Sequence, residues 1–389
     1  MVRTFQDTHP WITFHADLSR IDFRVWMLIG EARSKCEHIN GTPLHPETAR
    51  RLYLIYLSKG AFATTSIEGN TLSEEQVLQR VEGTLKLPDS QEYLGVGVDN
   101  IVDACNLIAD DVQQGRPLEL TPARVRHFNR LVLQNLTLDE DTVPGECRRH
   151  SVVVGNYRGA PADDCEYLLE QLCSWLNGGD FATEDPALVF AYAVLKAVLA
   201  HIYIAWIHPF GDGNGRTARL IELQLLMQSG LISMPATHLL SNHYNQTRSR
   251  YYQELERASK TRDISDFVRY ALEGFVDGLR NQLDVVRDQQ IQVTWKNYVH
   301  ERFRGKDTPA RRRQKHVVLD MPMGPIKRAE IRSVSDRVRD EYASKTEKTL
   351  TRDLNELLRL GLVVREGGEV AANYDLIHAF LPPRVSDDV

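Results

Sequence analysis

The chain has 389 residues, of which 42% are hydrophobic and 26% are charged, proportions that are ordinary for a globular protein. This length predicts two or three domains. The formal net charge of −6 excludes a general electrostatic attraction to nucleic acid or anionic membranes. The five cysteines are scattered without a CxxC pair, so we expect core residues in a reducing cytoplasm, not disulfides or a zinc site.

The first 280 residues read mainly as helix. The N-terminal segment MVRTFQDTHPWITF lacks the apolar run of a signal peptide, which favours a cytoplasmic location. One stretch, residues 187–207, is long and apolar enough to span a membrane. Because Lys196 and His201 interrupt it, we expect a central core helix and no membrane association.

A helix expected at about residues 47–69 ends in the segment ATTSIEGN. Gly69 is suited to the left-handed residue that follows a helix. Glu68 therefore lies in the last turn, where the helix dipole disfavours a carboxylate. Either this acid is simply exposed, or it is directed at a positive charge elsewhere in the fold.

The segment SVVVGNY, residues 151–157, is the clearest strand signal, because three valines precede a Gly-Asn pair that is typical of hairpin turns. Helical patterns then resume at residues 164–178. Residues 265–295 predict one or two further helices, and the arginine run Arg311–Arg313 is expected to lie in a solvated linker.

The segment IHPFGDGNGRTARLIELQLLMQ, residues 207–228, predicts an anion site. Its glycines are Gly211, Gly213 and Gly215. They allow the backbone to turn tightly and present N–H groups at a helix start. Arg216 and Arg219 project from one side of the first turn, where two cations oppose the helix dipole unless an anion is bound. The loop therefore predicts a polyphosphate ligand, with a structural turn and solvated arginines as the alternative.

Two side chains in this loop suit phosphate chemistry. Asp212 is a natural Mg²⁺ ligand beside phosphates. His208, next to the anion, is placed to take a proton from an incoming hydroxyl. No strand precedes the loop and no Lys-Ser/Thr follows it, so neither a Rossmann fold nor a P-loop fits.

The sequence HPFGDGNGRTAR matches without departure the HPFx[D/E]GNGRxxR signature of the Fic family, and the resemblance extends over roughly residues 12–275. It implies a mainly α-helical fold with a small β-hairpin flap, and transfer of AMP from ATP to a hydroxyl side chain of a target protein. The implied roles are general base for His208, Mg²⁺ ligand for Asp212, phosphate loop for Gly211, Gly213, Asn214 and Gly215, β-phosphate contact for Arg216 and γ-phosphate contact for Arg219.

The resemblance assigns three further elements. The predicted hairpin takes the place of the family's flap, with target-positioning residues Val152, Val153, Val154 and Gly155. Tyr251 and Tyr252 match a tyrosine pair associated with the adenosine pocket. TTSIEG matches the family's inhibitory pattern [S/T]xxxE[G/N] through Thr64, Glu68 and Gly69. It implies an ion pair between Glu68 and Arg219 that restrains ATP, with Thr64 supporting the helix end.

The C-terminal segment differs in charge and pattern. Residues 301–389 hold 18 Lys and Arg against 15 Asp and Glu, so this segment carries +3 and the remainder −9. Two helical patterns followed by strand, Gly-Gly turn and strand predict a winged helix-turn-helix. DNA binding is one interpretation, and recruitment of a target protein or a partner subunit, including a homodimer, is the other.

The sequence thus predicts four parts: an N-terminal helical region over residues 1–112 that carries the inhibitory helix, a catalytic core over 113–280, a helix or linker over 281–310, and a winged-helix-like domain over 311–389. The expected activity is AMP transfer to Ser, Thr or Tyr of a target and of the chain itself, with ATP as substrate and Mg²⁺ as cofactor. Two alternatives remain: a hydrolase that removes AMP using Glu68, and a DNA-binding regulator whose Fic part senses nucleotide.

Overall fold

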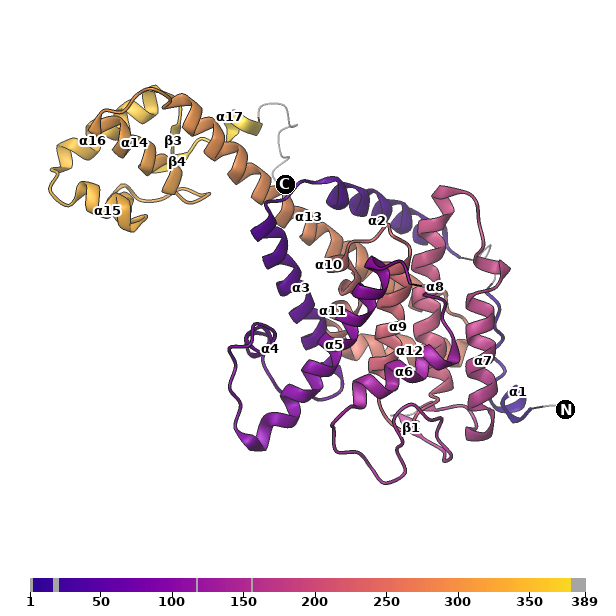
Figure 1. Cartoon of the computed structure of the whole chain (residues 1–389). Helices are drawn as coiled ribbons and strands as arrows, with labels where there is room; N and C mark the ends of the chain where they lie inside the picture. The colour runs from indigo at the N-terminus through magenta and orange to yellow at the C-terminus, as the bar shows by residue number, and fades with distance from the viewer. Residues whose placement is uncertain (1–2, 17–20, 117, 155–156, 379–389) are drawn as a thin grey trace. The chain divides into compact units, whose positions relative to one another are not determined.

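The computed structural model describes residues 3–16, 21–116, 118–154 and 157–378. The chain divides into two compact units, Met1–Asp284 and Val285–Val389, and the boundary falls inside helix α13 (Ser265–Arg302). We describe each unit by itself (Figure 1). The expectation of a mainly helical protein with a small two-stranded hairpin is confirmed. The finer division into four parts stays a prediction.

The first unit is built from helices and one hairpin. Its helices up to the hairpin are α1 (Thr4–Thr8), α2 (Phe23–Gly41), α3 (Pro46–Ile67), α4 (Glu74–Val81), α5 (Glu92–Gln113) and α6 (Pro122–Leu133). The hairpin pairs β1 (Val153–Val154) with β2 (Tyr157–Arg158) in antiparallel register. After it come α7 (Cys165–Leu176), α8 (Pro186–Ile207), α9 (Asn214–Gln228), α10 (Met234–Thr237), α11 (Leu239–Gln246), α12 (Arg248–Thr261) and the first part of α13.

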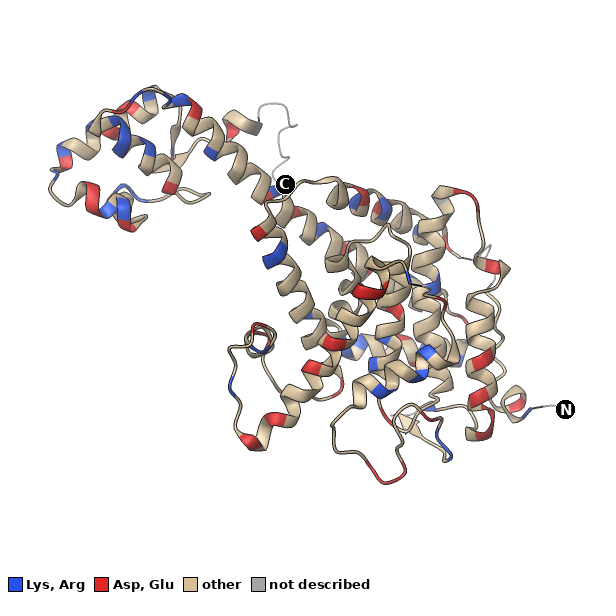
Figure 2. Cartoon of the chain, in the orientation of Figure 1, with Lys and Arg blue, Asp and Glu red and all other residues tan. Residues whose placement is uncertain are grey.

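Helices α8 and α9 pack against each other at the centre of this unit, and α2, α5, α6 and α7 pack around them (Figure 1). α8 can take this place because Lys196 is the only charged residue in its 22, and Figure 2 draws the helix almost wholly without charge. It is also the one helix among the described residues that is long and apolar enough to cross a membrane, and most of that stretch is buried in the unit. The central pair holds the loop between α8 and α9 against a rigid core.

Helix α3 packs against α11, α5 and α9, so its C-terminal end reaches the N-terminal end of α9. The helix ends as the sequence predicts. Glu68 occupies the C-cap, and Gly69 follows with a φ of +94°, a conformation that glycine adopts without strain.

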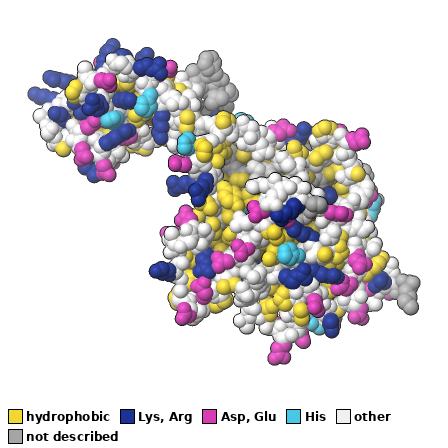
Figure 3. All heavy atoms as spheres, in the orientation of Figure 1, with side chains coloured by type: hydrophobic (Ala, Val, Ile, Leu, Met, Phe, Trp, Pro, Cys, Tyr) yellow, Lys and Arg dark blue, Asp and Glu magenta, His cyan; other side chains and the backbone are white. Residues whose placement is uncertain are grey.

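The second unit has its own apolar core, which includes Trp295, Val317, Tyr342, Leu354 and Val363. Its elements after α13 are α14 (Pro309–Asp320), α15 (Asp336–Tyr342), α16 (Glu347–Arg359), the antiparallel pair β3 (Val363–Glu366) and β4 (Glu369–Ala372), and α17 (Asp375–His378). Several Lys and Arg side chains lie on the face of this unit that Figure 3 shows.

The expectation of a solvated arginine linker at Arg311–Arg313 is wrong, because these residues lie inside α14. Thr308 caps that helix by accepting from the backbone N–H of Arg311. Arg313 then donates to Asp353 at 3.1 Å, and Arg311 pairs with Glu356 at 2.7 Å. The sequence alone indicated a linker here because the acidic partners of these arginines lie about forty residues further along the chain.

Candidate active site

The loop between α8 and α9 carries the predicted site. His208 directly follows α8 with a φ of +50°, and its backbone N–H donates to the carbonyl of Ile204 at 2.8 Å. Pro209 and the buried Phe210 follow, and Gly213 caps α9 with a φ of +76°. His208, directly after α8, and Gly213, directly before α9, therefore both have a left-handed backbone conformation.

Asn214 closes this loop with its side chain. Its Oδ1 accepts from the backbone N–H of Phe210 at 2.9 Å, and its Nδ2 donates to the carbonyl of Phe210 at 2.8 Å. Both polar groups of the amide are therefore used inside the loop. A role in holding the loop is what this geometry shows, and the expected contact of Asn214 with the α-phosphate stays a prediction.

Gly213 in the loop and Gly215 in the first turn of α9 lie where a side chain would collide. A Cβ on Gly213 would approach Asn129, Leu133 and Val132 to within 3.0–3.1 Å, in a backbone conformation that already disfavours other residues. A Cβ on Gly215 would lie 2.3 Å from Oε1 of Glu68. Glycine at position 215 thus allows the carboxylate from α3 to pack directly over the start of α9.

The two predicted arginines are both buried. Arg216 donates from Nη2 to Oδ2 of Asp212 at 3.1 Å and from Nη1 to the carbonyl of Val132 at 3.3 Å. Arg219 donates from Nη2 to Oε1 of Glu68 at 2.5 Å. Among the described residues, Arg216 Nε and Arg219 Nη1 have no hydrogen-bond partner. A buried guanidinium with a free N–H is costly, so these donors are well suited to an anionic ligand.

Thr64 also binds Arg219. Its Oγ1 accepts from Nε of Arg219 at 2.6 Å, and its backbone carbonyl accepts from Nη2 at 3.1 Å. We expected Thr64 to support the inhibitory helix end by hydrogen bonding, and these two bonds tie the end of α3 to Arg219. The neighbouring Thr65 makes the within-helix bond, to the carbonyl of Ala61 at 2.8 Å. Thr64 and Glu68 together hold one arginine.

The ion pair sets the ionisation of Glu68. Burial raises the pKa of this carboxyl, but the charge and hydrogen bond of Arg219, together with the nearby Arg216, bring the pKa below its ordinary value. The side chain of Glu68 is 31% exposed and that of Arg219 only 2%. Glu68 is therefore a carboxylate at neutral pH and forms a charge-assisted bond from the solvent side of the pair.

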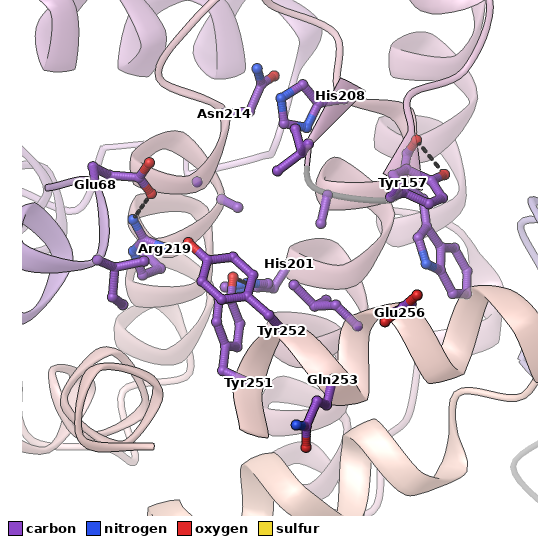
Figure 4. Close-up of a pocket in the computed structure, with 17 residues that line it drawn as sticks. Glu68, Tyr157, His201, His208, Asn214, Arg219, Tyr251, Tyr252, Gln253 and Glu256 are labelled. Carbon is purple, nitrogen blue, oxygen red and sulfur yellow. Dashed lines mark hydrogen bonds and ion pairs between the residues drawn. The ribbon is translucent and has the colours of Figure 1, made fainter. Parts of the chain in front are cut away.

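A cavity of about 470 Å³ lies between the loop, the end of α3, the hairpin and α12. Figure 4 shows Glu68 bonded to Arg219 on one side, His208 and Asn214 on another, and the tyrosines of α12 across from them. The predicted residues that line it are Glu68, Val154, His208, Asn214, Gly215, Arg219, Tyr251 and Tyr252. Gly211, Asp212 and Gly213 lie in the adjoining loop and Arg216 in the first turn of α9, and Thr64, Gly69, Val152 and Val153 are not part of the lining. Gly155 lies outside the described residues.

His208 is neutral in this environment. Burial, together with the nearby Arg148 guanidinium, lowers the pKa of His208 to about 4, although Glu68 and Asp212 act in the opposite direction. An uncharged imidazole has a free lone pair at neutral pH and is able to accept a proton.

Behind the cavity lies a buried polar chain that the sequence analysis did not find. The hydroxyl of Tyr251 and Nε2 of His201 share a hydrogen bond at 2.8 Å. Nδ1 of His201 lies 3.3 Å from a carboxylate oxygen of Glu222. Glu222 also accepts from the hydroxyl of Tyr244 at 2.8 Å. The signal available was Glu222, the one acid in the mostly apolar helical pattern of residues 220–227. This chain fixes the ring of Tyr251, whereas Tyr252 is 40% exposed.

The flap hairpin is short and exposed. Val153 pairs with Arg158 and Val154 with Tyr157, and both valines are exposed. The hydroxyl of Tyr157 donates to the carbonyl of Trp206 at 2.8 Å, which ties β2 to the end of α8. Val154 and Tyr157 both line the cavity, so the hairpin borders the site.

The side chain of Asp212 suits a metal ion that binds together with the phosphates of a nucleotide. The described residues contain no cluster of three or more His, Cys, Asp or Glu side chains able to hold a metal. Asp212 supplies one half-exposed carboxylate beside the loop. Mg²⁺ is commonly held by one or two carboxylates together with substrate phosphates. Asp212 alone therefore suits Mg²⁺ bound through phosphate groups.

The sequence of this chain is similar to those of known proteins over part of its length. Residues 119–226 match the model of the Fic/DOC family. Protein adenylyltransferase fic-1 of Caenorhabditis briggsae is 28% identical over 263 residues, which cover 65% of this chain and 46% of that protein. Protein adenylyltransferase Fic of Drosophila ananassae is 31% identical over 216 residues, covering 54% of this chain and 38% of that protein. The chain therefore matches less than half the length of these curated relatives.

Two solved structures share the fold. A Fic family protein from Desulfovibrio desulfuricans superposes with a TM-score of 0.53 at 17% identity, covering 89% of this chain and 95% of that chain. A fragment of Fic-1 from Caenorhabditis elegans superposes with a TM-score of 0.54 at 24% identity, covering 68% and 73%. With their signature loop between two packed helices, residues 119–226 of this chain resemble a Fic domain, and the chain is similar at 28–31% identity to proteins named protein adenylyltransferase.

Proposed function

We propose that this protein transfers AMP from ATP to a hydroxyl side chain, Ser, Thr or Tyr, of a target protein and of itself. One observation carries the proposal. A neutral histidine, a helix N-terminus and a buried arginine with a free N–H line a single cavity large enough for a nucleotide. The relatives named protein adenylyltransferase support the same activity.

The chemistry follows from the positions of these groups. Backbone N–H groups at the start of α9, with Arg216 and Arg219, bind the phosphates. The target hydroxyl attacks the α-phosphorus, the bond from that phosphorus to the bridging oxygen breaks, and pyrophosphate leaves. An imidazole nitrogen of His208 takes the hydroxyl proton. Mg²⁺, when bound through Asp212 and the phosphates, neutralises part of their charge.

The hairpin suits a target segment in extended conformation. Strand β1 is exposed, and the hairpin borders the cavity near His208 through Val154 and Tyr157. Strand addition to the edge at Val152–Val154 would place a target hydroxyl by backbone hydrogen bonds, which read little of the target's sequence.

We further infer that Glu68 restrains the reaction. Arg219 is the residue that the γ-phosphate would contact, and Glu68 and Thr64 already occupy two of its three nitrogens. ATP must displace Glu68 from Arg219 or bind without that contact. The restraint is contained in this chain, because α3 belongs to the same compact unit as the loop.

Hydrolytic removal of AMP is a second candidate. Glu68 lines the same cavity as His208, and its lowered pKa makes it a carboxylate that is able to orient a water molecule. In that reaction Glu68→Gln would abolish release of AMP from a labelled protein. In the transfer reaction the same substitution would raise labelling.

The position of the label in ATP tests the proposal. The purified protein and its Glu68→Gly variant are incubated with bacterial lysate and ATP labelled at either the α- or the γ-phosphate. AMP transfer predicts protein-bound label from α-labelled ATP alone, in greater amount for Glu68→Gly, and none when His208→Ala is added. Label from γ-labelled ATP, or no label from either, would overturn the assignment.

A further inference from the structure

Arg148 is a buried arginine that lies outside the signature loop and the cavity lining. Its side chain is 4% exposed and makes four hydrogen bonds to backbone carbonyls. Nε donates to His208 at 2.7 Å and Nη1 to His150 at 2.5 Å, while Nη2 donates to Ala160 and, at 3.5 Å, to Ile207. The backbone N–H of Arg148 also donates to the carbonyl of Pro209 at 2.9 Å.

These acceptors belong to two separate parts of the site. Ile207, His208 and Pro209 are the end of α8 and the start of the phosphate loop. His150 and Ala160 flank the hairpin, one just before β1 and the other just after β2. One guanidinium thus joins the loop that carries the proposed general base to both ends of the flap.

The loop needs this support because of the conformation of His208. A φ of +50° is unfavourable for a residue with a side chain, and such a residue persists only where its surroundings hold it. The carbonyls at the end of α8 also lack helical partners and carry the negative end of the helix dipole. A buried arginine satisfies these carbonyls with the appropriate charge.

The flap hairpin needs the support of Arg148 for a different reason. Two strands of two residues each provide little stability of their own. Gly159 lies so close to the loop that a Cβ there would approach both Arg148 Nη2 and His208 Cβ to 2.9 Å. The hairpin therefore depends on contacts with the loop, and Arg148 supplies the charged ones.

We propose that Arg148 is a positioning residue that sets the distance between His208 and the flap, and so between the proton acceptor and the target hydroxyl. This inference rests on the proposed AMP transfer and adds a residue to it. Arg148 is not placed to touch ATP, since it does not line the cavity. Its loss should therefore slow the chemical step and weaken target binding while ATP binding remains.

The neighbouring residue provides a matched control. Arg149 has the same side chain but is exposed. Arg148→Lys keeps the positive charge and removes the planar fork that reaches carbonyls on both sides, whereas Arg149→Lys makes the same chemical change at the surface. Both are made in the Glu68→Gly background, so that the proposed restraint does not mask the rate.

The first readout separates kcat from ATP affinity. For Arg148→Lys we expect kcat to fall about 100-fold, the scale of a small misplacement of reacting groups. We expect the Kd for ATP to stay within about threefold, and Arg149→Lys to change neither value by more than about twofold. An equal loss of kcat and ATP affinity together with a lowered Tm would indicate a merely structural arginine and would overturn the proposal.

The second readout does not depend on activity. The amides of Gly159 and Ala160 bond to the carbonyls of Val152 and Trp206, so their hydrogen exchange reports how the flap is held. Arg148→Lys should speed this exchange by about tenfold, the scale of a lost hydrogen bond from a charged donor. Exchange equal to that of Arg149→Lys would overturn the proposal even if the protein transfers no AMP. Faster exchange without any AMP transfer would support the positioning role and reject the proposed reaction instead.

If Arg148→Lys fails to fold, Gly159→Ala provides the same test, because it separates the flap from the loop while Arg148 remains. We expect the same loss of kcat with ATP affinity retained, and wild-type kcat in this variant would contradict the proposal.

Discussion

Buried charges in the two units are used in different ways. In the first unit, Arg219 is buried beside the cavity and keeps Nη1 without a partner among the described residues. In the second unit, Asp353 is equally buried, but its carboxylate accepts from Gln314 at 2.9 Å, from Arg313 at 3.1 Å and from Tyr342 at 2.8 Å. Arg219 therefore keeps an N–H donor for a ligand, whereas the carboxylate of Asp353 has its hydrogen-bond donors within its own unit.

The comparison indicates where function and stability are separable. A buried charge with internal partners holds a core together, and removing it leaves those partners without bonds. A buried charge that faces a cavity is available for binding, and changing its surroundings should alter activity with little effect on folding. The predictions below test this distinction, from the largest expected effect to the smallest.

His208→Ala should lower AMP transfer by about 10²–10⁴-fold, the usual contribution of a general base. ATP binding and Tm should remain close to wild type, because the imidazole faces the cavity. Labelled-ATP transfer and calorimetric ATP binding measure the two quantities. His38→Ala, at an exposed position of α2, is the control. A wild-type transfer rate in His208→Ala would remove the assignment of the base.

Asp353→Ala should show the opposite behaviour. We expect the free energy of unfolding of the second unit to fall by about 3 kcal/mol or more, since a buried ion pair loses one partner. The rate of AMP transfer by the first unit should not change. Denaturant unfolding followed by Trp295 fluorescence measures stability, with Asp336→Ala as the control, because the side chain of Asp336 is 91% exposed. A loss of transfer without a loss of stability would show that our reading of Asp353 is wrong.

Thr64→Val should raise AMP transfer by about three- to tenfold, the scale of the net contribution of one hydrogen bond. The substitution keeps the shape of the side chain and removes the acceptor of Arg219 Nε. Thr65→Val is the matched control, because the hydroxyl of Thr65 bonds within its own helix. Equal effects of the two substitutions would indicate a change in helix stability instead of a release of Arg219.

The pH dependence of the restraint should be small. The pKa of Glu68 is lowered in the folded protein, so the ion pair is present above the ordinary carboxyl pKa and is lost as the pH falls through the lowered value. The groups that face His208 are Arg148, Glu68 and Asp212, and the pKa of about 4 for His208 keeps it neutral over the same range. The ratio of the Glu68→Gly rate to the wild-type rate should therefore vary by less than about twofold between about pH 6 and about pH 8. A steep change in this range would point to another titrating group.

The parts of this site that the sequence predicted are those encoded within short segments. The run from His208 to Arg219 carries its own glycines and arginines, and the segment from Thr64 to Gly69 carries its own helix end. The acid at an unfavourable helix position left two interpretations open, simple exposure or a cation elsewhere, and Glu68 does contact Arg219 in the structure.

The parts that the sequence did not predict depend on contacts between distant segments. Arg148 bonds to the carbonyl of a residue sixty positions away, and backbone acceptors leave no pattern in a sequence. The two bonds from Asn214 to Phe210 depend on the loop geometry, which no periodicity encodes. The arginine run of α14 looked like a linker because its acidic partners lie on another helix.

The most direct measurement of the central claim compares ATP with ADP. If Glu68 occupies the arginine that the γ-phosphate requires, Glu68→Gln should increase the calorimetric affinity for ATP by about tenfold, the scale of a bond from a charged donor, and leave the affinity for ADP nearly unchanged. An equal gain for ATP and ADP, or a gain for neither, would contradict competition between Glu68 and ATP for Arg219.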